Sequence, residues 1–193
     1  MTKWKRFILF IGKYLMKYKD ELTRSMTFLG QKEDTYFIGQ SCSSAGTSMF
    51  DTLKDVPMEK RLELPVFEET QLGMSTGMAL NGTKVISIFP RWDFLICGAS
   101  QLVNHLNRLK EYSNGEYQPS VTIRTAVGAD RPLNPQSQHR NNYSEAFRLM
   151  CDNIEIIELH EPEDIFPAYE KAYNRTDGKS TILVEFGNFY SEK

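Results

Sequence analysis

The sequence predicts an α/β fold in which a doubly wound, mostly parallel sheet carries helices on both faces. Short runs of apolar and β-branched residues alternate along the chain with segments of helical periodicity. This alternation is typical of a parallel sheet whose strands are joined by helices. The runs are apolar throughout instead of at every second position, which is expected of strands buried on both faces.

The chain begins with a segment of helical periodicity. From Trp4 to Leu29 apolar residues recur at spacings of three and four, and Gly30 ends the pattern, which predicts one or two amphipathic helices. The apolar run at residues 7–11 is too short for a signal peptide. We therefore expect residues 1–30 to be an N-terminal helical segment that covers a core or a partner, and residues 31–193 to be the main domain.

The apolar runs that follow predict five strands. The first run, TYFIGQ, combines β-branched and aromatic residues and is closed by Gly39. The others are KVISIFP, SVTIRT, IEIIEL and STILVEF, so strands are expected at residues 35–40, 84–90, 120–125, 154–159 and 180–186. Helical patterns lie between them at residues 70–80, 94–112, 143–151 and 162–173.

Two long segments interrupt this alternation. Residues 42–60 are rich in Ser and Gly, and residues 126–142 contain two prolines and a histidine without any periodicity. Long loops in compact domains are often functional. Both loops leave the carboxyl ends of predicted strands, where open parallel sheets bind their ligands.

Composition and charge exclude several classes of function. The 193 residues suit one core, with 40% hydrophobic and 25% charged residues, an ordinary globular composition. The net charge of −2 gives no reason to expect a nucleic-acid or membrane partner. Three cysteines and three histidines are scattered without CxxC or metal-ligand spacing, which predicts a reduced cytoplasmic protein without a metal site: Cys42, Cys97, Cys151, His105, His139 and His160.

The stretch ELPVFEETQLGMSTGMALNG, at residues 63–82, places two adjacent acids at the start of a predicted helix. Glu68 and Glu69 precede a face of small residues. Acids in a first helical turn are stabilised by the helix dipole, and small residues permit close backbone approach. From these residues alone, the acids are either a structural helix start or part of a site.

This stretch and the following FPRWDFLICGASQLVNHL resemble the pyrimidine-binding domain of the thiamine-diphosphate-dependent transketolase and 2-oxo acid dehydrogenase family. The likeness is to beta subunits of pyruvate or branched-chain type, without their C-terminal domain. It covers residues 18–190 and implies the thiamine-diphosphate pyrimidine-binding fold. The positions that carry it, in the family's order, are Pro65, Glu68, Gly73, Gly77, Ala79, Gly82, the strand at residues 85–89 and Trp92-Asp93-Phe94.

The resemblance assigns roles to several residues. Glu68 matches the glutamate that holds N1′ of the aminopyrimidine and so activates thiamine diphosphate, whereas Glu69 is interpreted as a helix-start acid. Phe94 matches the aromatic residue that packs on the pyrimidine ring, and Trp92 is a second candidate for this contact. For both aromatic residues, a place in the core is the alternative. Gln40 stands where the family usually has an acid, so the hydrogen bonds near the cofactor are expected to differ.

A histidine is the second candidate for catalysis. Beta subunits of the dehydrogenase type carry a His-Ser-Gln run before a Glu-Ala-aromatic helix, and its histidine is a proton donor near the reacting carbon. This chain has PQSQHRNNYSEAF, in which the run is rearranged. His139 is therefore the candidate general acid/base, with a solvated loop histidine as the alternative.

The resemblance also implies a partner chain. The Gly-Asp-Gly plus Asn motif that holds Mg²⁺ and the diphosphate is absent, and the sequence ends where the family's third domain would begin. We expect an alpha-like subunit to bind Mg²⁺ and the diphosphate, in an α2β2 assembly.

We therefore expect a beta-like subunit of an enzyme that acts on a 2-oxo acid or a ketose by decarboxylation with acyl or ketol transfer, and that is active only with its partner. Two alternatives remain. One is a non-catalytic interaction module that retains the fold and stabilises a partner. The other is a free-standing domain that binds a small molecule.

Overall fold

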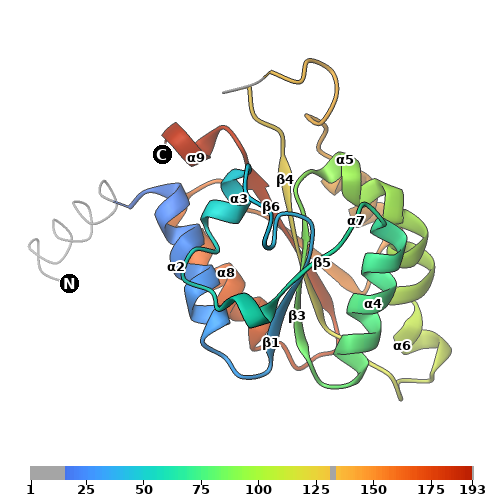
Figure 1. Ribbon diagram of the computed structural model, residues 1–193. Helices are drawn as coiled ribbons and strands as arrows, with labels where there is room; N and C mark the ends of the chain where they lie inside the picture. The colour runs from blue at the N-terminus through green and yellow to red at the C-terminus, as the bar shows by residue number, and fades with distance from the viewer. Residues whose placement is uncertain (1–15, 131–133, 193) are drawn as a thin grey trace, which may run out of the picture.

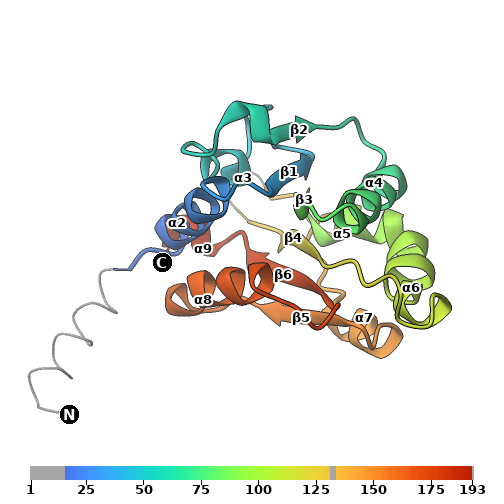
Figure 2. The same ribbon diagram turned by 90° about the horizontal axis from the view of Figure 1, so that it is seen from below.

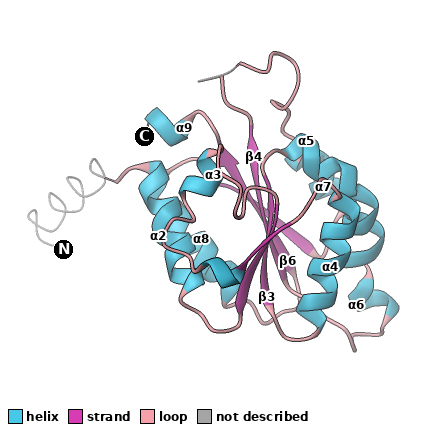
Figure 3. Ribbon diagram, in the orientation of Figure 1, coloured by secondary structure: helices cyan, strands magenta, loops and turns pink. Residues whose placement is uncertain are grey.

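A computed structural model describes residues 16–130 and 134–192, and these residues contain one sheet of six parallel strands (Figures 1 and 3). The strands stand in the order β2-β1-β3-β4-β6-β5. The predicted α/β class with a parallel sheet is therefore confirmed. The bounds are β1 Thr35–Gly39, β2 Arg61–Glu63, β3 Lys84–Phe89, β4 Val121–Val127, β5 Ile154–Glu158 and β6 Ser180–Phe186.

Helices cover both faces of the sheet (Figures 1 and 2). One face carries α2 (Tyr18–Gly30), α8 (Pro162–Tyr173) and α9 (Phe189–Glu192). The other face carries α4 (Glu68–Leu80), α5 (Trp92–Leu95) and α7 (Ser144–Met150). Two short helices, α3 (Ser48–Asp51) and α6 (Leu109–Tyr112), lie in the connections. Strand residues alternate between the two cores, as Leu183 on one side and Val184 on the other illustrate.

The structure departs from the predicted elements in several places, and the short helices α3 and α9 are among the elements that the sequence pattern does not predict. The predicted helix at residues 94–112 is instead α5, a 3₁₀ turn (Ile96–Gly98), a π-helical turn (Gln101–Leu106) and α6. Gly98 lies where this segment packs on α4, because a Cβ atom there would be 2.7 Å from Leu72 Cδ1. The strand β2 went unpredicted because its three residues are too few to show a pattern.

The helix α2 contributes to the same core as the sheet. Tyr18, Leu22, Met26 and Leu29 are fully buried, at spacings of four, four and three, and they pack with side chains of α8. This is the amphipathic pattern that the sequence predicts. Residues 1–15 of the predicted N-terminal segment lie outside the described residues, and the division at residue 30 stays a prediction.

A buried ion pair joins β4 to β6 on the α2 and α8 face. Arg124 Nε lies 2.5 Å from Glu185 Oε1, and both side chains are fully buried. The hydroxyls of Tyr169 in α8 and Tyr190 in α9 donate hydrogen bonds to the same carboxylate. Burial, together with the Glu185 charge, raises the pKa of both tyrosines, so they remain donors. The pair thus connects two helices to the centre of the sheet.

Replacing Arg124 by Met should lower the free energy of unfolding by about 3–5 kcal/mol, because it leaves the Glu185 charge buried without its cation. Urea denaturation measures this loss. The double variant Arg124→Met/Glu185→Leu is the control, and it should recover most of the loss because no buried charge remains. If the double variant lost as much unfolding free energy as the two single variants together, this account would be contradicted.

Candidate functional site

The carboxyl ends of the strands, at the upper end of the sheet in Figure 1, bring two predicted site residues together. Gln40 directly follows β1, and Glu68 is the first residue of α4. Gln40 Nε2 donates a hydrogen bond of 3.2 Å to Glu68 Oε1. Glu68 is only 8% exposed, and Gln40 is the one hydrogen-bond donor to its carboxylate among the described residues. The second carboxylate oxygen, Oε2, therefore keeps its capacity to accept a hydrogen bond.

One turn further along α4, Gln71 anchors the helix to the sheet. Its side chain is fully buried, and Nε2 donates hydrogen bonds to Ile88 O at 2.9 Å and to Ser87 Oγ at 3.1 Å. A Cβ atom at Gly39, where φ is +132°, would lie 2.3 Å from Gln71 Nε2. Glycine is therefore required at the end of β1. The sequence pattern does not single out Gln71, although a polar residue three positions after Glu68 shares its helix face.

Exposed apolar side chains lie around the start of α4. Val66 is 71% exposed, Phe67 60% and Ile96 39%, and we call these three residues the apolar rim. The turn that contains Ile96 packs on the helix start, because a Cβ atom at Gly98 would be 3.1 Å from Glu68 O. Clustered exposed apolar side chains are typical of ligand sites and subunit contacts.

Glu63 holds the segment that follows Gln40. Its Oε1 accepts a hydrogen bond from the Ser41 backbone N–H at 2.9 Å, and its Oε2 accepts from Cys42, Ser43 and Ser44 at 2.7, 2.6 and 3.1 Å. Partial burial opposes the charge, but the four backbone donors outweigh it and lower the pKa of Glu63 below its usual range. The charge of Glu63 therefore fixes the backbone beside Gln40.

The structure also brings Phe94 and His139 together. Their ring centroids are 4.9 Å apart, although the two residues are 45 positions apart in the sequence. His139 has a φ of +58°, and its carbonyl oxygen lies so close to Gly128 that a Cβ atom there would be 2.1 Å away. Two contacts therefore fix the position of His139, one with the chain at the end of β4 and one with α5. The sequence pattern alone places this histidine in a loop without a defined position.

Trp92 belongs to the core. Its side chain is fully buried, and its ring lies 5.1 Å from the Phe147 ring and 6.4 Å from the Tyr143 ring. Of the two interpretations of Trp92, this packing favours the core one. Glu69 is exposed in the first turn of α4, as expected for a helix-start acid.

The two buried cysteines carry protonated thiols. Burial and the Glu63 charge raise the pKa of Cys42 to about 12, and burial and Asp152 raise that of Cys151 to about 11, so both thiols are protonated at neutral pH.

No group of three or more His, Cys, Asp or Glu side chains in residues 16–130 and 134–192 is arranged to hold a metal ion. No helix in the described part of the chain has the length and apolar character needed to cross a bilayer.

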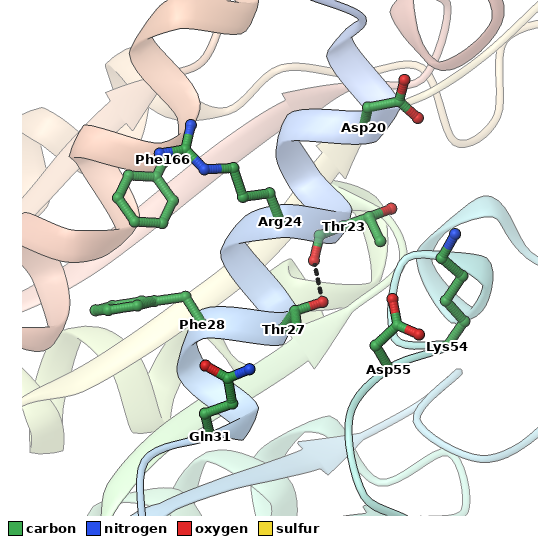
Figure 4. A pocket seen from close by; sticks show the side chains of 9 residues that line it. All are labelled: Asp20, Thr23, Arg24, Thr27, Phe28, Gln31, Lys54, Asp55 and Phe166. Atoms are coloured by element: carbon green, nitrogen blue, oxygen red, sulfur yellow. Dashed lines mark hydrogen bonds between the residues drawn. The ribbon is translucent and has the colours of Figure 1, made fainter.

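A hollow of about 520 Å³ lies on the opposite side of the molecule, along the outer face of α2 (Figure 4). The Arg24 guanidinium lies 4.0 Å from the centre of the Phe166 ring at one side of it. Two acids and two bases balance its charge, and none of the predicted site residues lines it. The lining residues are Asp20, Thr23, Arg24, Thr27, Phe28, Gln31, Lys54, Asp55 and Phe166.

The curated proteins to which this chain is similar include beta subunits of pyruvate dehydrogenase, in agreement with the predicted resemblance. The chain is 27% identical over 132 residues to the pyruvate dehydrogenase E1 component subunit beta of Gracilaria tenuistipitata var. liui, a match over 68% of this chain and 39% of that protein. It is 24% identical over 102 residues to the mitochondrial subunit of the same name from Ascaris suum, over 53% and 27%. The chain thus matches less than half the length of these relatives. No model of a known protein family matches it.

Solved structures share the fold. A split-gene transketolase, described as an inactive beta4 tetramer, superposes with a TM-score of 0.59 at 13% identity, over 90% of this chain and 52% of that one. The 2-oxoglutarate:ferredoxin oxidoreductase from Magnetococcus marinus, with 2-oxoglutarate, coenzyme A and succinyl-CoA bound, gives 0.58 at 11%, over 90% and 29%. At these identities the likeness establishes the fold. Together with the curated relatives, it confirms the resemblance to the pyrimidine-binding domain.

Replacing Glu63 by Gln should speed amide hydrogen exchange at residues 41–44 and lower the free energy of unfolding by about 1–2 kcal/mol near neutral pH, because neutral acceptors bind backbone donors less strongly. The folded pKa lies below the ordinary value of 4.5, so this contribution is full above that value and is lost as the pH falls through the lowered pKa. Glu59→Gln, at an exposed acid nearby, is the control. If the difference in unfolding free energy between wild type and Glu63→Gln stayed constant as the pH falls below the lowered pKa, the charge of Glu63 would not have this role.

Proposed function

We propose that this chain is a beta-like subunit of a thiamine-diphosphate-dependent enzyme and supplies the aminopyrimidine half of the cofactor site. The observation that carries the proposal is the state of Glu68. This carboxylate is almost buried, yet it accepts one hydrogen bond, from Gln40, among the described residues. The second oxygen of this nearly buried carboxylate receives no hydrogen bond from the described residues, so it can accept one from a ligand N–H group.

The chain's own residues would then act on a proton. When bound, thiamine diphosphate supplies a thiazolium carbon that attacks a 2-keto group. Glu68 Oε2 would accept the hydrogen bond of N1′ and so favour the imino tautomer of the aminopyrimidine. Gln40 would hold Oε1, so that only Oε2 faces the ring. Phe94, which lies partly exposed against His139, would pack on the pyrimidine.

The other half of the site would come from a partner. The residues around Glu68 fit a pyrimidine, because an acid and an aromatic ring border the apolar rim, but the sequence lacks the family motif that holds Mg²⁺ and the diphosphate. We therefore propose an alpha-like partner that binds both, in an α2β2 assembly. The apolar rim, with Phe67 60% exposed, supports such a contact. The description of the split-gene transketolase as an inactive beta4 tetramer supports the need for a second kind of chain.

The substrate would be a 2-oxo acid or a ketose, with decarboxylation and acyl or ketol transfer as the reaction. The beta-subunit names of the curated relatives favour the 2-oxo acid. His139 would serve as the general acid/base, because it lies beside Phe94 at the same edge of the sheet. The free thiols of Cys42, Cys97 and Cys151 favour a reducing compartment, and we propose the cytoplasm.

A non-catalytic interaction module is the second candidate. The amide of Gln40, where the family usually has an acid, favours it because an amide cannot exchange a proton with Glu68 as a second carboxyl group would. Under this alternative, the chain would stabilise a partner through the same surface, and changes at Glu68 would leave the activity of the assembly unchanged.

Replacing Glu68 by Gln should lower kcat of the assembled enzyme by roughly 100-fold or more, because proton transfer by a positioned acid contributes this much. Turnover of a 2-oxo acid by a mixture with the diphosphate-binding partner measures the loss, and calorimetry with thiamine diphosphate and Mg²⁺ measures cofactor binding. Glu69→Gln is the matched control, and its activity should equal that of the wild type. Equal activity of Glu68→Gln and the wild type would favour the interaction module.

Replacing Phe67 by Ser should weaken binding to the partner by roughly tenfold or more, because exposed aromatic side chains at an interface contribute strongly to affinity. Analytical ultracentrifugation of the mixture measures the affinity. Leu149→Ser is the control, because Leu149 is 89% exposed on α7, away from the apolar rim. Equal effects of the two changes would show that the rim has no special role.

A further inference from the structure

The segment after His139 is fastened to α5. Asp93 Oδ1 accepts hydrogen bonds from Asn141 Nδ2 at 2.5 Å and from the Tyr143 hydroxyl at 3.5 Å. Burial and the Asp93 carboxylate raise the pKa of Tyr143, which is consistent with a phenol that donates to an ionised acid. Phe94, the next residue of α5, contacts the His139 ring at 4.9 Å. Two consecutive residues of one helical turn therefore hold both His139 and the chain that follows it.

Two buried atoms in this cluster have no hydrogen-bond partner within the described residues. One is Asp93 Oδ2, which is an acceptor, and the other is His139 Nδ1, which is able to donate. Both side chains lie next to Phe94. Asp93 precedes Phe94 in the chain, and the His139 ring contacts the Phe94 ring. Buried polar atoms are rarely left unpaired, and these two complement each other.

A purely structural role for residue 93 would not need a carboxylate. The amide oxygen of an asparagine could also accept from Asn141 and Tyr143, because both donors use a single oxygen. A carboxylate adds a charge and a second buried acceptor, and both are unfavourable unless a donor reaches that acceptor. His139 Nδ1, the unpaired atom of the ring that contacts Phe94, can supply such a donor through a water molecule.

We propose that Asp93 is a positioning residue for His139. Its Oδ2 accepts the Nδ1–H of the imidazole through one bridging water molecule, while its Oδ1 holds the loop through Asn141. The neutral imidazole is thereby kept in the Nδ1–H tautomer, and Nε2 is left with the lone pair that faces the site. Only the use of Nε2 in proton transfer rests on the proposed function. The pairing of Asp93 with His139 stands apart from it.

Long-range ¹H–¹⁵N NMR spectra of the full chain, labelled in its three histidines, distinguish the two tautomers without cofactor or partner. The exposed His105 is the internal reference. We expect the Nδ1–H to Nε2–H ratio of His139 to exceed that of His105 by roughly tenfold, the size expected for one charge-assisted hydrogen bond. Asp93→Asn should bring the ratio down to that of His105. Glu145→Gln, at an exposed acid of α7, should leave it unchanged.

An Nε2–H tautomer of His139 in the wild type overturns the proposal, whatever the variants do. An Asp93→Asn variant that keeps the wild-type ratio, with unchanged His105 signals as evidence of folding, overturns it as well. In the assembled enzyme, Asp93→Asn should lower kcat with little change in KM, because a positioning residue acts through His139. If His139 is in the Nδ1–H tautomer but the assembly shows no turnover, the proposed function is refuted and the pairing of Asp93 with His139 still stands.

Discussion

The close contact between the end of β1 and Gln71 of α4 sets the geometry of the candidate site. Because Gly39 has no side chain, Gln71 Nε2 reaches the Ile88 carbonyl oxygen directly across the end of β1. This contact fixes the direction in which the chain leaves β1, so that Gln40 meets Glu68. The same register places Glu63 beside Gly39, where its carboxylate collects the backbone N–H groups that follow. Gly39 thus aligns the carboxylates of Glu68 and Glu63 with their hydrogen-bond donors.

The two faces of the sheet differ in how their buried polar groups are satisfied. On the α2 and α8 face, the Glu185 carboxylate accepts hydrogen bonds from Arg124 and from two tyrosine hydroxyls, and Arg124 Nη1 is the atom of this network left without a partner among the described residues. At the carboxyl edge of the α4 and α5 face, several buried atoms have no partner among the described residues. They are Gln71 Oε1, Trp92 Nε1, Asp93 Oδ2, Thr125 Oγ1 and His139 Nδ1. Both oxygens of the buried Glu185 thus find donors within the chain, whereas the α4 and α5 face retains several buried groups without a partner among the described residues.

The sequence predicts the fold more completely than the site. Four long apolar runs and the TYFIGQ run suffice for five of the strands, and the spacing around Glu68 suffices for the resemblance, because both are local patterns. The contact of Phe94 with His139 depends instead on the path of the chain after β4, and the pairing of Gln40 with Glu68 depends on strand order. Gln71 escapes notice because a buried glutamine inside a helix looks like any surface residue until the sheet is packed beneath it.

The unpaired atoms at this edge bear on stability as well as on chemistry. Each buried polar atom without a partner costs about 1–3 kcal/mol, a large fraction of the roughly 5–15 kcal/mol that separates folded from unfolded domains. A chain that keeps several such atoms gives up stability when it is alone. Any ligand or partner that supplies the missing donors and acceptors binds only the folded state and recovers that free energy. Binding at this edge and stability of the domain are therefore linked by the same few atoms.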